Sequence, residues 1–325
     1  MKIIRGSEAF KKLQVKNCVV TLGNFDGVHR GHQKIIKKAV ERARAIRGSS
    51  VVYTFDPHPL NVLRPEQEPP KITTFEEKAH LISMLGVDYL VSEHFTKSFA
   101  AKSPEEFLQE IICGRLQPRE IVIGHDYSFG RGRNGSVALL QQAGLRQGFS
   151  VHVEQDIRDR SLPVRSTMIR KMITEGRVSL AAKLLGGEYR ISGTVVHGKK
   201  RRIGFPTANL SHVKDLVPHN GVYAVLADTP YGTYGAAVNI GFNPTFDGKK
   251  RTIEAHLFDF NDDLYGRGIT LRFVRRIRLE RRFDSPEELR RQIGLDIEKA
   301  KKILAGRKEW PAETCADAHH GSRRA

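Results

Sequence analysis

Short apolar runs alternate with longer stretches of helical periodicity through the first half of the chain, and this alternation constrains the fold more than any other feature. Runs rich in β-branched and aromatic residues predict strands at 18–22, 51–55, 87–91, 121–123 and 149–153. The stretches between them predict helices at 33–46, 75–85, 104–112 and 137–146. Such βαβ units predict an α/β domain, with a parallel sheet covered by helices and ligands at the carboxyl ends of its strands.

Local signals place two of the helix starts. Thr74 with Glu77, and Ser103 with Glu106, have the spacing of a capping box, in which each side chain accepts a hydrogen bond from the other residue's backbone N–H. Pro104 follows Ser103 at the first helical position, where a missing N–H is tolerated. We therefore expect helices to begin after Thr74 and after Ser103.

The pattern changes after Gly186 and Gly187, where short β-rich runs are separated by Gly, Pro and Asn. The runs predict strands at 191–196, 221–227, 234–240, 252–258 and 269–277. Short strands in such a series are typical of a small antiparallel β-barrel. Ser285, Pro286 and Glu288 then form a helix start, and the last predicted helix extends to about residue 304.

These patterns divide the chain into a parallel-sheet domain at 1–186, a barrel domain at 187–305 and a polar, aperiodic tail at 306–325 that we expect to be disordered. Residues Lys2 and Arg5 carry charges near the start, and no apolar run follows them. Neither a signal peptide nor a membrane span is therefore predicted, and we expect a cytoplasmic protein.

Cysteine spacing and charge exclude some classes of function and leave others open. Cys18, Cys113 and Cys315 form no CxxC pair, so neither a zinc site nor a disulfide framework is predicted. The formal net charge of +18 attracts phosphates of any kind. RNA binding through this charge, including the basic run at 275–282, is an alternative function; with no RNA-binding motif visible, we expect no specific nucleic-acid partner. Self-association is left open.

The segment GNFDGVHRGH at 23–32 places a glycine-rich turn after the first predicted strand and His29 and His32 at the entry to the first helix. Helix N-terminal amides attract an anion, and glycines let the backbone approach it closely. Paired histidines can donate hydrogen bonds to phosphoryl oxygens as charge develops in a transition state. We interpret the segment as a phosphate site. The alternatives are a helix cap with one solvated histidine, or a metal site.

Three more polar segments follow predicted strands: TFDPHP at 54–59, GHDYSFGRGRNG at 124–135 and RSTMIR at 165–170. The hydroxyls of Ser166 and Thr167 and the guanidinium of Arg170 suit a polyphosphate, because Arg offers bidentate donors. A helix cap is the alternative for the Ser-Thr pair, and a rigid turn is the alternative for TFDPHP.

A dinucleotide fingerprint is not predicted, although Gly130, Gly132 and Gly135 fit GxGxxG and Glu154 lies roughly where a ribose-binding acid is expected. The residues HDYSF separate these glycines from the preceding strand, whereas the fingerprint needs them directly after it.

The segment GFPTANL at 204–210 offers oxygen ligands from Thr207 and Asn209 along one edge of an extended segment. Mg²⁺ takes such ligands together with phosphates and water. A turn followed by an edge strand is the alternative for PTAN taken alone.

The order of these motifs resembles that of the bacterial bifunctional riboflavin kinase/FMN adenylyltransferase family, also called FAD synthetase, nearly from end to end. The second half adds NIGFNPTF at 239–246 and EAHLFDFNDDLYG at 254–266 to the motifs above. The resemblance implies an N-terminal Rossmann-like nucleotidyltransferase domain and a barrel riboflavin kinase domain. It also implies that ATP phosphorylates riboflavin to FMN and then adenylylates FMN to FAD, with release of pyrophosphate.

The resemblance also implies roles for individual residues. In the first domain, it implies contacts to ATP from Gly23, Phe25, His29, Gly31, His32, Ser166, Thr167 and Arg170. It implies flavin contacts from Asp56, Asp126 and Phe129, and from Asn239 in the barrel. In the barrel, Gly204 and Thr207 would bind ATP, Thr207 and Asn209 would bind Mg²⁺, and Glu254 would be the catalytic base. The alternative for Glu254 is an exposed strand carboxylate that balances Lys250 and Arg251.

Two positions depart from the family's pattern. Arg165 stands where the family has Ser, a change that would alter phosphate affinity without abolishing the site. The loop HGKKRRIG at 197–204 is shorter and more basic than the family's glycine-containing loop. We expect it to hold ATP through charge, and so to be sensitive to salt. The alternative is a solvated loop whose charges do nothing specific.

Overall fold

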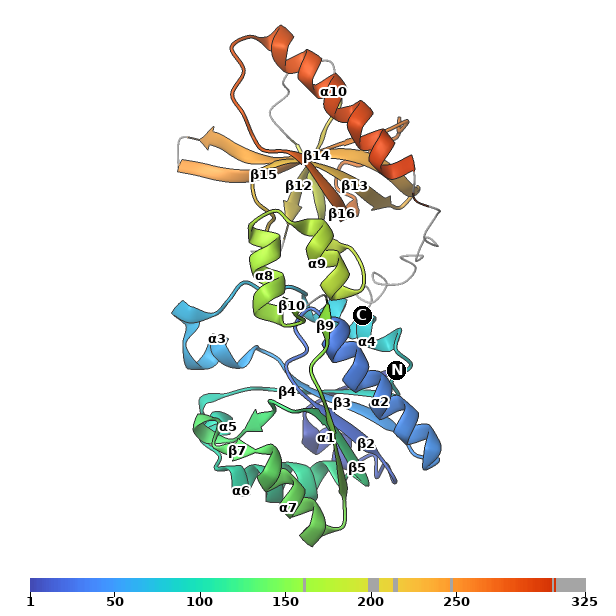
Figure 1. Cartoon of the computed structure of the whole chain (residues 1–325), viewed down its shortest axis with the longest axis vertical. Helices are drawn as coiled ribbons and strands as arrows, with labels where there is room; N and C mark the ends of the chain where they lie inside the picture. Colours follow the sequence, from blue (N-terminus) through green and yellow to red (C-terminus); the bar gives the residue numbers. More distant parts are fainter. Residues whose placement is uncertain (160–161, 198–204, 213–215, 246–247, 306, 308–325) are drawn as a thin grey trace, which may run out of the picture. The chain divides into compact units, whose positions relative to one another are not determined.

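The computed structural model describes residues 1–159, 162–197, 205–212, 216–245, 248–305 and 307, which form two compact units, 1–168 and 169–325 (Figure 1). Gly204, the rest of the basic loop after His197 and the tail apart from Arg307 lie outside the described residues. Along the chain, the boundary between the two units falls after residue 168, well before the glycine pair at 186–187. Helix α9 (Val178–Leu185) belongs to the second unit because it contacts strands of the barrel.

The first unit is built on a six-stranded sheet in which all neighbouring strands are parallel, in the order β1-β4-β3-β2-β5-β8. Its strands are β1 (Lys2–Arg5), β2 (Val19–Leu22), β3 (Ser50–Phe55), β4 (Tyr89–Glu93), β5 (Glu120–Gly124) and β8 (Ser150–Glu154). The predicted parallel sheet is confirmed. The sequence did not predict the edge strand β1, because its four residues are mostly exposed and show no apolar pattern.

Helices cover both faces of this sheet. They are α1 (Ser7–Lys11), α2 (Arg30–Ala45), α3 (Pro59–Leu63), α4 (Phe75–Ser83), α5 (Lys97–Ala100), α6 (Pro104–Glu106), the π-helix η2 (Phe107–Leu116) and α7 (Val137–Gln147), with short 3₁₀ turns η1 (Pro65–Gln67) and η3 (Arg131–Arg133). Both predicted capping boxes are present, at Thr74 and at Ser103. Apolar residues of α2 and α4 pack on one face of the sheet, and those of α1, η2 and α7 pack on the other.

Two small hairpins follow strands of the sheet. Strands β6 (Ser128–Phe129) and β7 (Gly135–Ser136) pair after β5, and β9 (Arg158–Asp159) pairs with β10 (Leu162–Pro163) after β8. The glycines of the rejected dinucleotide fingerprint belong to the first hairpin, where Gly130 and Gly132 have φ of 71° and 64°. They make a turn between two strands, so they do not begin a helix after a strand.

The second unit is a closed six-stranded barrel in the order β11-β12-β15-β14-β13-β16, which confirms the predicted barrel. Its strands are β11 (Tyr189–Val196), β12 (Ala208–His212), β13 (Gly221–Thr229), β14 (Gly232–Thr245), β15 (Gly248–Leu257) and β16 (Gly268–Arg278). Helix α8 (Ser166–Thr174) contains the boundary between the units, and α10 (Pro286–Ala305) follows the barrel.

Helix α10 lies on the barrel where the strands carry small side chains. Its residues Ile297 and Ala300 pack with Ala224 and Phe258 in one apolar cluster. Gly235 permits the close approach, because a Cβ there would lie 3.1 Å from a methyl carbon of Leu304. The start of the helix is capped as predicted, since the Ser285 hydroxyl accepts a hydrogen bond from the Glu288 N–H at 3.1 Å.

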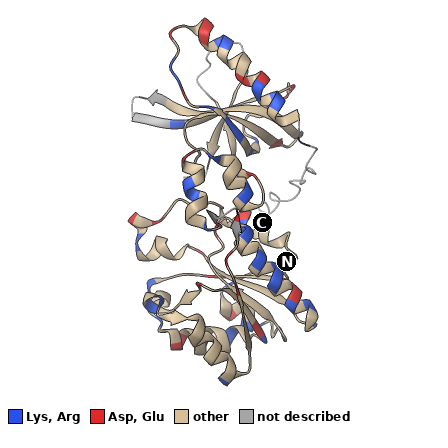
Figure 2. Cartoon of the chain, viewed as in Figure 1, with Lys and Arg blue, Asp and Glu red and all other residues tan. Residues whose placement is uncertain are grey.

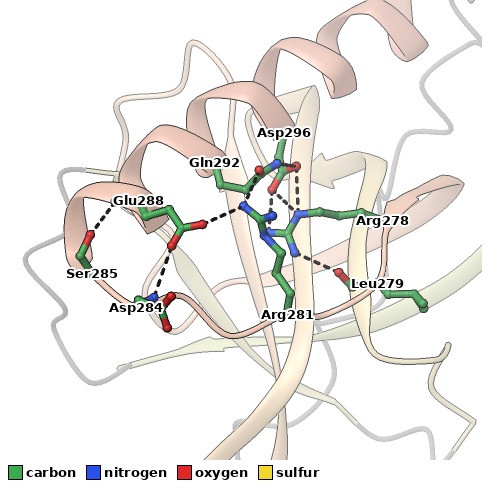
Figure 3. Close-up of polar contacts among 8 residues, drawn as sticks. All are labelled: Arg278, Leu279, Arg281, Asp284, Ser285, Glu288, Gln292 and Asp296. Carbon is green, nitrogen blue, oxygen red and sulfur yellow. Dashed lines mark hydrogen bonds and ion pairs between the residues drawn. The ribbon is translucent and has the colours of Figure 1, made fainter.

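A buried ion pair fixes α10 to the last barrel strand (Figure 3). The Arg278 Nε and Nη2 lie 2.9 and 2.8 Å from one carboxylate oxygen of Asp296, whose side chain is only 5% exposed. Gln292 donates to the other carboxylate oxygen at 2.9 Å. Both charges are therefore paired and hydrogen-bonded, the condition under which burial of an ion pair is tolerated.

We predict that Asp296→Ala destabilises the barrel unit by about 3 kcal/mol, because the guanidinium of Arg278, which is only 20% exposed, would lose the carboxylate that pairs with it. Calorimetry should show the barrel transition lowered by roughly 6–12 °C. The control is Lys171→Ala, which breaks the exposed pair of Lys171 with Glu175 and should change stability by less than about 0.5 kcal/mol. Equal effects of the two substitutions would contradict the prediction.

Candidate active sites

The paired histidines stand at the first turn of α2. His29 is the N-cap residue, and its Nδ1 accepts a hydrogen bond from the His32 backbone N–H at 3.3 Å. The two rings stack with their centroids 3.6 Å apart. A ring that caps through Nδ1 carries its proton on Nε2 and can donate there. The cap is thus present, and it is compatible with a phosphate contact by the other nitrogen.

The two glycines beside the histidine pair, Gly23 and Gly31, have no room for a side chain without crowding a neighbouring ring. A Cβ on Gly31 would lie 3.1 Å from the His29 ring, and one on Gly23 would lie 3.0 Å from the Phe25 ring. Phe25 itself is buried, with a φ of 50°. Its ring lies edge-on to His32 with the centroids 5.2 Å apart. Phe25 therefore supports the histidine from within the protein.

His32 is held in its neutral form. Burial lowers its pKa well below the ordinary value, and the neighbouring His29 and Lys78 lower it further. Its buried Nδ1 has no hydrogen-bond partner within the described residues. A buried polar atom without a partner is costly unless a ligand satisfies it. The site therefore offers His32 as an uncharged group to an anion.

A buried carboxylate holds this loop in place. Asp26 accepts hydrogen bonds from the backbone N–H groups of Ile72 and Thr73 at 3.1 and 3.2 Å, and from the Thr73 hydroxyl at 3.3 Å. The Thr73 hydroxyl in turn accepts from the Gly27 N–H at 3.1 Å. The sequence analysis did not single out Asp26, although it stands inside the GNFDG motif.

The RSTMIR segment reaches the same loop. The Ser166 hydroxyl donates to the Asp26 carbonyl at 3.0 Å, and the Val164 carbonyl lies 3.4 Å from the place of a Cβ on Gly31. Thr167 is exposed at the start of α8. Arg170 lies one helical turn beyond Ser166 and belongs to the second unit, so the structure does not place it relative to the histidines.

Arg165, the departure from the family's pattern, points to an acidic partner. Its Nη2 lies 2.8 Å from a carboxylate oxygen of Asp156, and this carboxylate raises the pKa of Arg165. The guanidinium is about half exposed.

The three residues expected to contact flavin in this unit occupy different environments. Asp56, at the end of β3, forms an ion pair with Arg5 at 3.2 Å. Asp126 is exposed after β5. Phe129 is a core residue, and its ring centroid lies 5.4 Å from that of Phe107. Asp126 is thus accessible to a ligand, whereas Phe129 packs beneath the surface.

Lys and Arg residues recur along α2 (Figure 2), and Arg30, Lys34, Lys37 and Arg44 among them are exposed. A groove of about 530 Å³ there is lined by Arg30, Gln33, Lys34, Lys37, Lys38, Glu41, Glu154 and Ile157. Lys34 pairs with Glu154 at 2.8 Å, and Lys38 pairs with Glu41 at 3.0 Å. These carboxylates offset part of the positive charge, as in a solvated basic surface.

In the barrel, three of the predicted residues form one row across three neighbouring strands. Asn209 of β12 stands opposite Glu254 of β15, which stands opposite Asn239 of β14. Opposite residues have Cβ atoms about 5 Å apart and share a face of the sheet. Ile253 and Ala255 point into the barrel core, so the row faces outward. A carboxylate is thereby flanked by two amide side chains.

The GFPTANL segment is tied to this row by a histidine. His256 Nδ1 donates to the Pro206 carbonyl at 2.8 Å, and its ring lies edge-on to Phe205 with the centroids 5.6 Å apart. Thr207 is exposed directly before β12. The sequence analysis did not select His256; its place two residues after Glu254 on the same strand face was the available signal.

Two oxygen-bearing side chains, Thr207 before β12 and Asn209 in the row, suit a hard cation. Among the described residues no group of three or more His, Cys, Asp or Glu could hold a metal ion. Thr207 and Asn209 instead supply hydroxyl and amide oxygens, which Mg²⁺ accepts when phosphates and water complete its coordination.

The chain thus has two candidate active sites, a histidine pair at the edge of a parallel sheet and an outward carboxylate on a barrel, one in each unit. The FAD synthetase family model matches residues 11–168, and the riboflavin kinase family model matches residues 185–304. Each match falls on one of the two candidate sites.

Similar proteins extend over nearly the whole chain. The bifunctional riboflavin kinase/FMN adenylyltransferase of Buchnera aphidicola (subspecies Acyrthosiphon pisum) is 39% identical over 91% of this chain and 96% of its own. The Escherichia coli K12 protein of the same description is 37% identical over the same shares. The chain therefore belongs to the bifunctional riboflavin kinase/FMN adenylyltransferase family, and it is an enzyme of flavin cofactor biosynthesis.

A solved structure described as a macrolide-efflux protein from Streptococcus pneumoniae has the same fold, with a TM-score of 0.82 and 32% identity over 93% of this chain and 99% of that one. Among the described residues, no helix has the length and apolar character needed to cross a membrane.

We predict from the burial of His32 that its imidazole titrates below the ordinary histidine range, as measured by NMR of the intact protein. His29→Ala should raise this pKa, because a neighbouring ring that lowers it is removed. Since the folded-state pKa lies below the unfolded one, the contribution of His32 to stability is present at neutral pH and is lost as the pH falls. His152→Gln, whose ring contacts Glu120 at the start of β5, is the control and should leave the His32 titration unchanged.

Proposed function

We propose that the two units divide the two reactions: the parallel-sheet unit adenylylates FMN, and the barrel unit phosphorylates riboflavin. The observation that carries this proposal is the stacked His29–His32 pair at the start of α2, in which His32 is neutral and its Nδ1 has no hydrogen-bond partner in the part of the chain that the structure describes. This arrangement suits the phosphates of ATP, because the helix N-terminus already favours negative charge there.

Adenylyl transfer in the first unit needs no protein nucleophile. A phosphate oxygen of FMN attacks the α-phosphorus of ATP, and the bond from the α-phosphorus to the bridging oxygen of pyrophosphate breaks. His29, His32 and Ser166 would bind and orient the phosphates, and the loop amides would stabilise the charge on the leaving pyrophosphate. We also assign Gly23 and Gly31 to this cradle, because a side chain at either position would crowd the ring of Phe25 or of His29.

Kinase chemistry in the barrel needs a proton acceptor. A hydroxyl of riboflavin attacks the γ-phosphorus of ATP, its proton passes to the Glu254 carboxylate, and ADP leaves. Asn239 and Asn209 stand on either side of Glu254 in the sheet, where they would orient the flavin and the phosphates. Thr207 and Asn209 would hold Mg²⁺, which neutralises phosphate charge when bound.

The remaining assignments follow from the family's chemistry. We propose that Arg170, Thr167, Asp56 and Asp126 contact substrates at the first site. We further propose that the enzyme works in the cytoplasm on riboflavin, FMN and ATP, without a specific nucleic-acid partner.

We predict that His32→Ala lowers FMN adenylylation by about 100-fold or more, because the lost donor acts where charge develops in the transition state. Riboflavin phosphorylation by the same protein should stay within about two-fold, since that site lies in the other unit. Both activities are measured by chromatography of FMN and FAD formed with Mg-ATP. His80→Ala, an exposed histidine of α4, is the matched control. Loss of both activities in a folded His32→Ala protein would refute the division of labour.

We predict the reverse pattern for Glu254→Gln. Riboflavin phosphorylation should fall by about 100-fold or more, because an amide cannot accept the proton, whereas FAD formation from supplied FMN should persist. Asp259→Asn, at a side chain that is 89% exposed, is the control for loss of a carboxylate and should keep both activities. Near-normal kinase turnover of Glu254→Gln would remove Glu254 as the base.

A further inference from the structure

A buried lysine lies beneath the loop that carries the paired histidines. Lys78 is on α4, and only 8% of its surface is exposed. Its ammonium donates a hydrogen bond to the Asn24 carbonyl at 2.9 Å and lies 3.5 Å from the Thr54 hydroxyl. A lysine is almost never buried in this way unless its charge is paired or hydrogen-bonded.

The two partners of Lys78 lie at the carboxyl ends of neighbouring strands, one just after β2 and one near the end of β3. Asn24 follows β2 in the glycine-rich loop, and Thr54 is the next-to-last residue of β3. The Thr54 hydroxyl itself donates to the Asn24 carbonyl at 3.2 Å. One cation and one hydroxyl therefore converge on a single carbonyl oxygen and fix the path of the loop as it leaves the sheet.

The helix that carries Lys78 is fixed to the same loop. Asp26 binds the backbone N–H groups of Ile72 and Thr73, just before α4, and the Thr74 capping box begins the helix. The side chain of Lys78 then reaches back to Asn24, two residues before Asp26 in the loop. The loop is thus attached to α4 and the segment before it at two points. The carboxylate of Asp26 makes one attachment, and the ammonium of Lys78 makes the other.

The charges around Lys78 explain its electrostatic effect. Burial lowers the pKa of Lys78, whereas the carboxylates of Asp26 and Asp56 raise it, and Lys71 opposes them. The two carboxylates favour the ammonium form. The positive charge in turn contributes, after burial and His29, to the lowered pKa of His32. The ionisable groups acting on His32 are thus His29 and Lys78, and those acting on Lys78 include Asp26, Asp56 and Lys71.

We propose that Lys78 is a positioning residue of the adenylylation site, a role that rests on the assignment of FMN adenylylation to this unit. Its ammonium holds the Asn24 carbonyl so that the loop presents the histidines to the phosphates of ATP, and its charge adds to the burial that keeps His32 a neutral hydrogen-bonding group. Protein covers Lys78, so it acts through the loop and the histidine and does not touch the substrate.

Two substitutions in the full-length protein separate charge from shape. Lys78→Met keeps the length of the side chain and removes its charge, and Lys78→Arg keeps the charge. We expect Lys78→Met to raise the KM for ATP in FMN adenylylation by about ten-fold or more, the effect of losing a hydrogen bond from a charged group. NMR should show a higher titration midpoint for His32 in Lys78→Met than in the unmodified protein, and an unchanged midpoint in Lys78→Arg.

Lys71→Met, at a lysine near the same helix whose side chain is 47% exposed, is the matched control and should keep both the KM and the His32 midpoint. Riboflavin phosphorylation should stay within about two-fold in every variant. The proposal would be overturned if Lys78→Met left the KM for ATP and the His32 titration midpoint unchanged. It would also be overturned if a folded Lys78→Arg protein showed the defects expected of Lys78→Met. If Lys78→Met fails to fold, Lys78→Arg alone decides, because retention of the His32 midpoint and of at least a third of the activity is required of it.

The proposed function fails by a different result. If His32→Ala keeps full FMN adenylylation, the assignment of the reaction to these histidines is wrong whatever Lys78 does. If His32→Ala is inactive and Lys78→Met behaves as the unmodified protein, only the role of Lys78 is refuted.

Discussion

The candidate site of the first unit depends on Asp26, whose carboxylate is buried. The Asp26 carboxylate accepts hydrogen bonds from the segment before α4. The Asp26 backbone carbonyl accepts another from Ser166 at the start of α8. Three segments far apart in the sequence therefore meet at one residue of the loop after β2. Without these bonds the loop amides, the histidines and the RSTMIR segment would have no common frame, and each unmade bond in this buried place would cost free energy.

The two units gather polar groups by different geometric rules. In the parallel sheet, strands β2, β3 and β4 end at one edge, so the loops that follow them meet there. In the barrel, the strands are antiparallel, and register decides which residues stand side by side. Asn209, Glu254 and Asn239 come from three strands and form one outward row because their registers align. Phosphate transfer is compatible with both arrangements, since it needs positioning and charge stabilisation more than any particular fold.

Much of the architecture follows from local sequence signals. The β-rich runs, the two capping boxes and the helix start at Ser285 all stand where they were predicted. The exceptions are elements with weak local signals. Strand β1 is a short exposed edge, and the helix after Pro104 continues as a π-helix whose bounds periodicity does not reveal. The units separate inside α8 because packing of α9 on the barrel, a long-range effect, outweighs the glycine pair that follows it.

The sequence by itself determined the two classes of domain, the motifs and the histidine pair, because periodicity, caps and motif spacing are properties of neighbouring residues. Tertiary structure alone decided which side chains are buried at the sites. It placed Phe129 in the core, paired Arg165 with Asp156 and buried Lys78 against Asn24. Lys78 and Asn24 are 54 residues apart in the sequence. Burial shifts the pKa of an ionisable group, and the size of the shift depends on all the groups packed around it. That environment is assembled only when distant segments come together, so no local pattern records it.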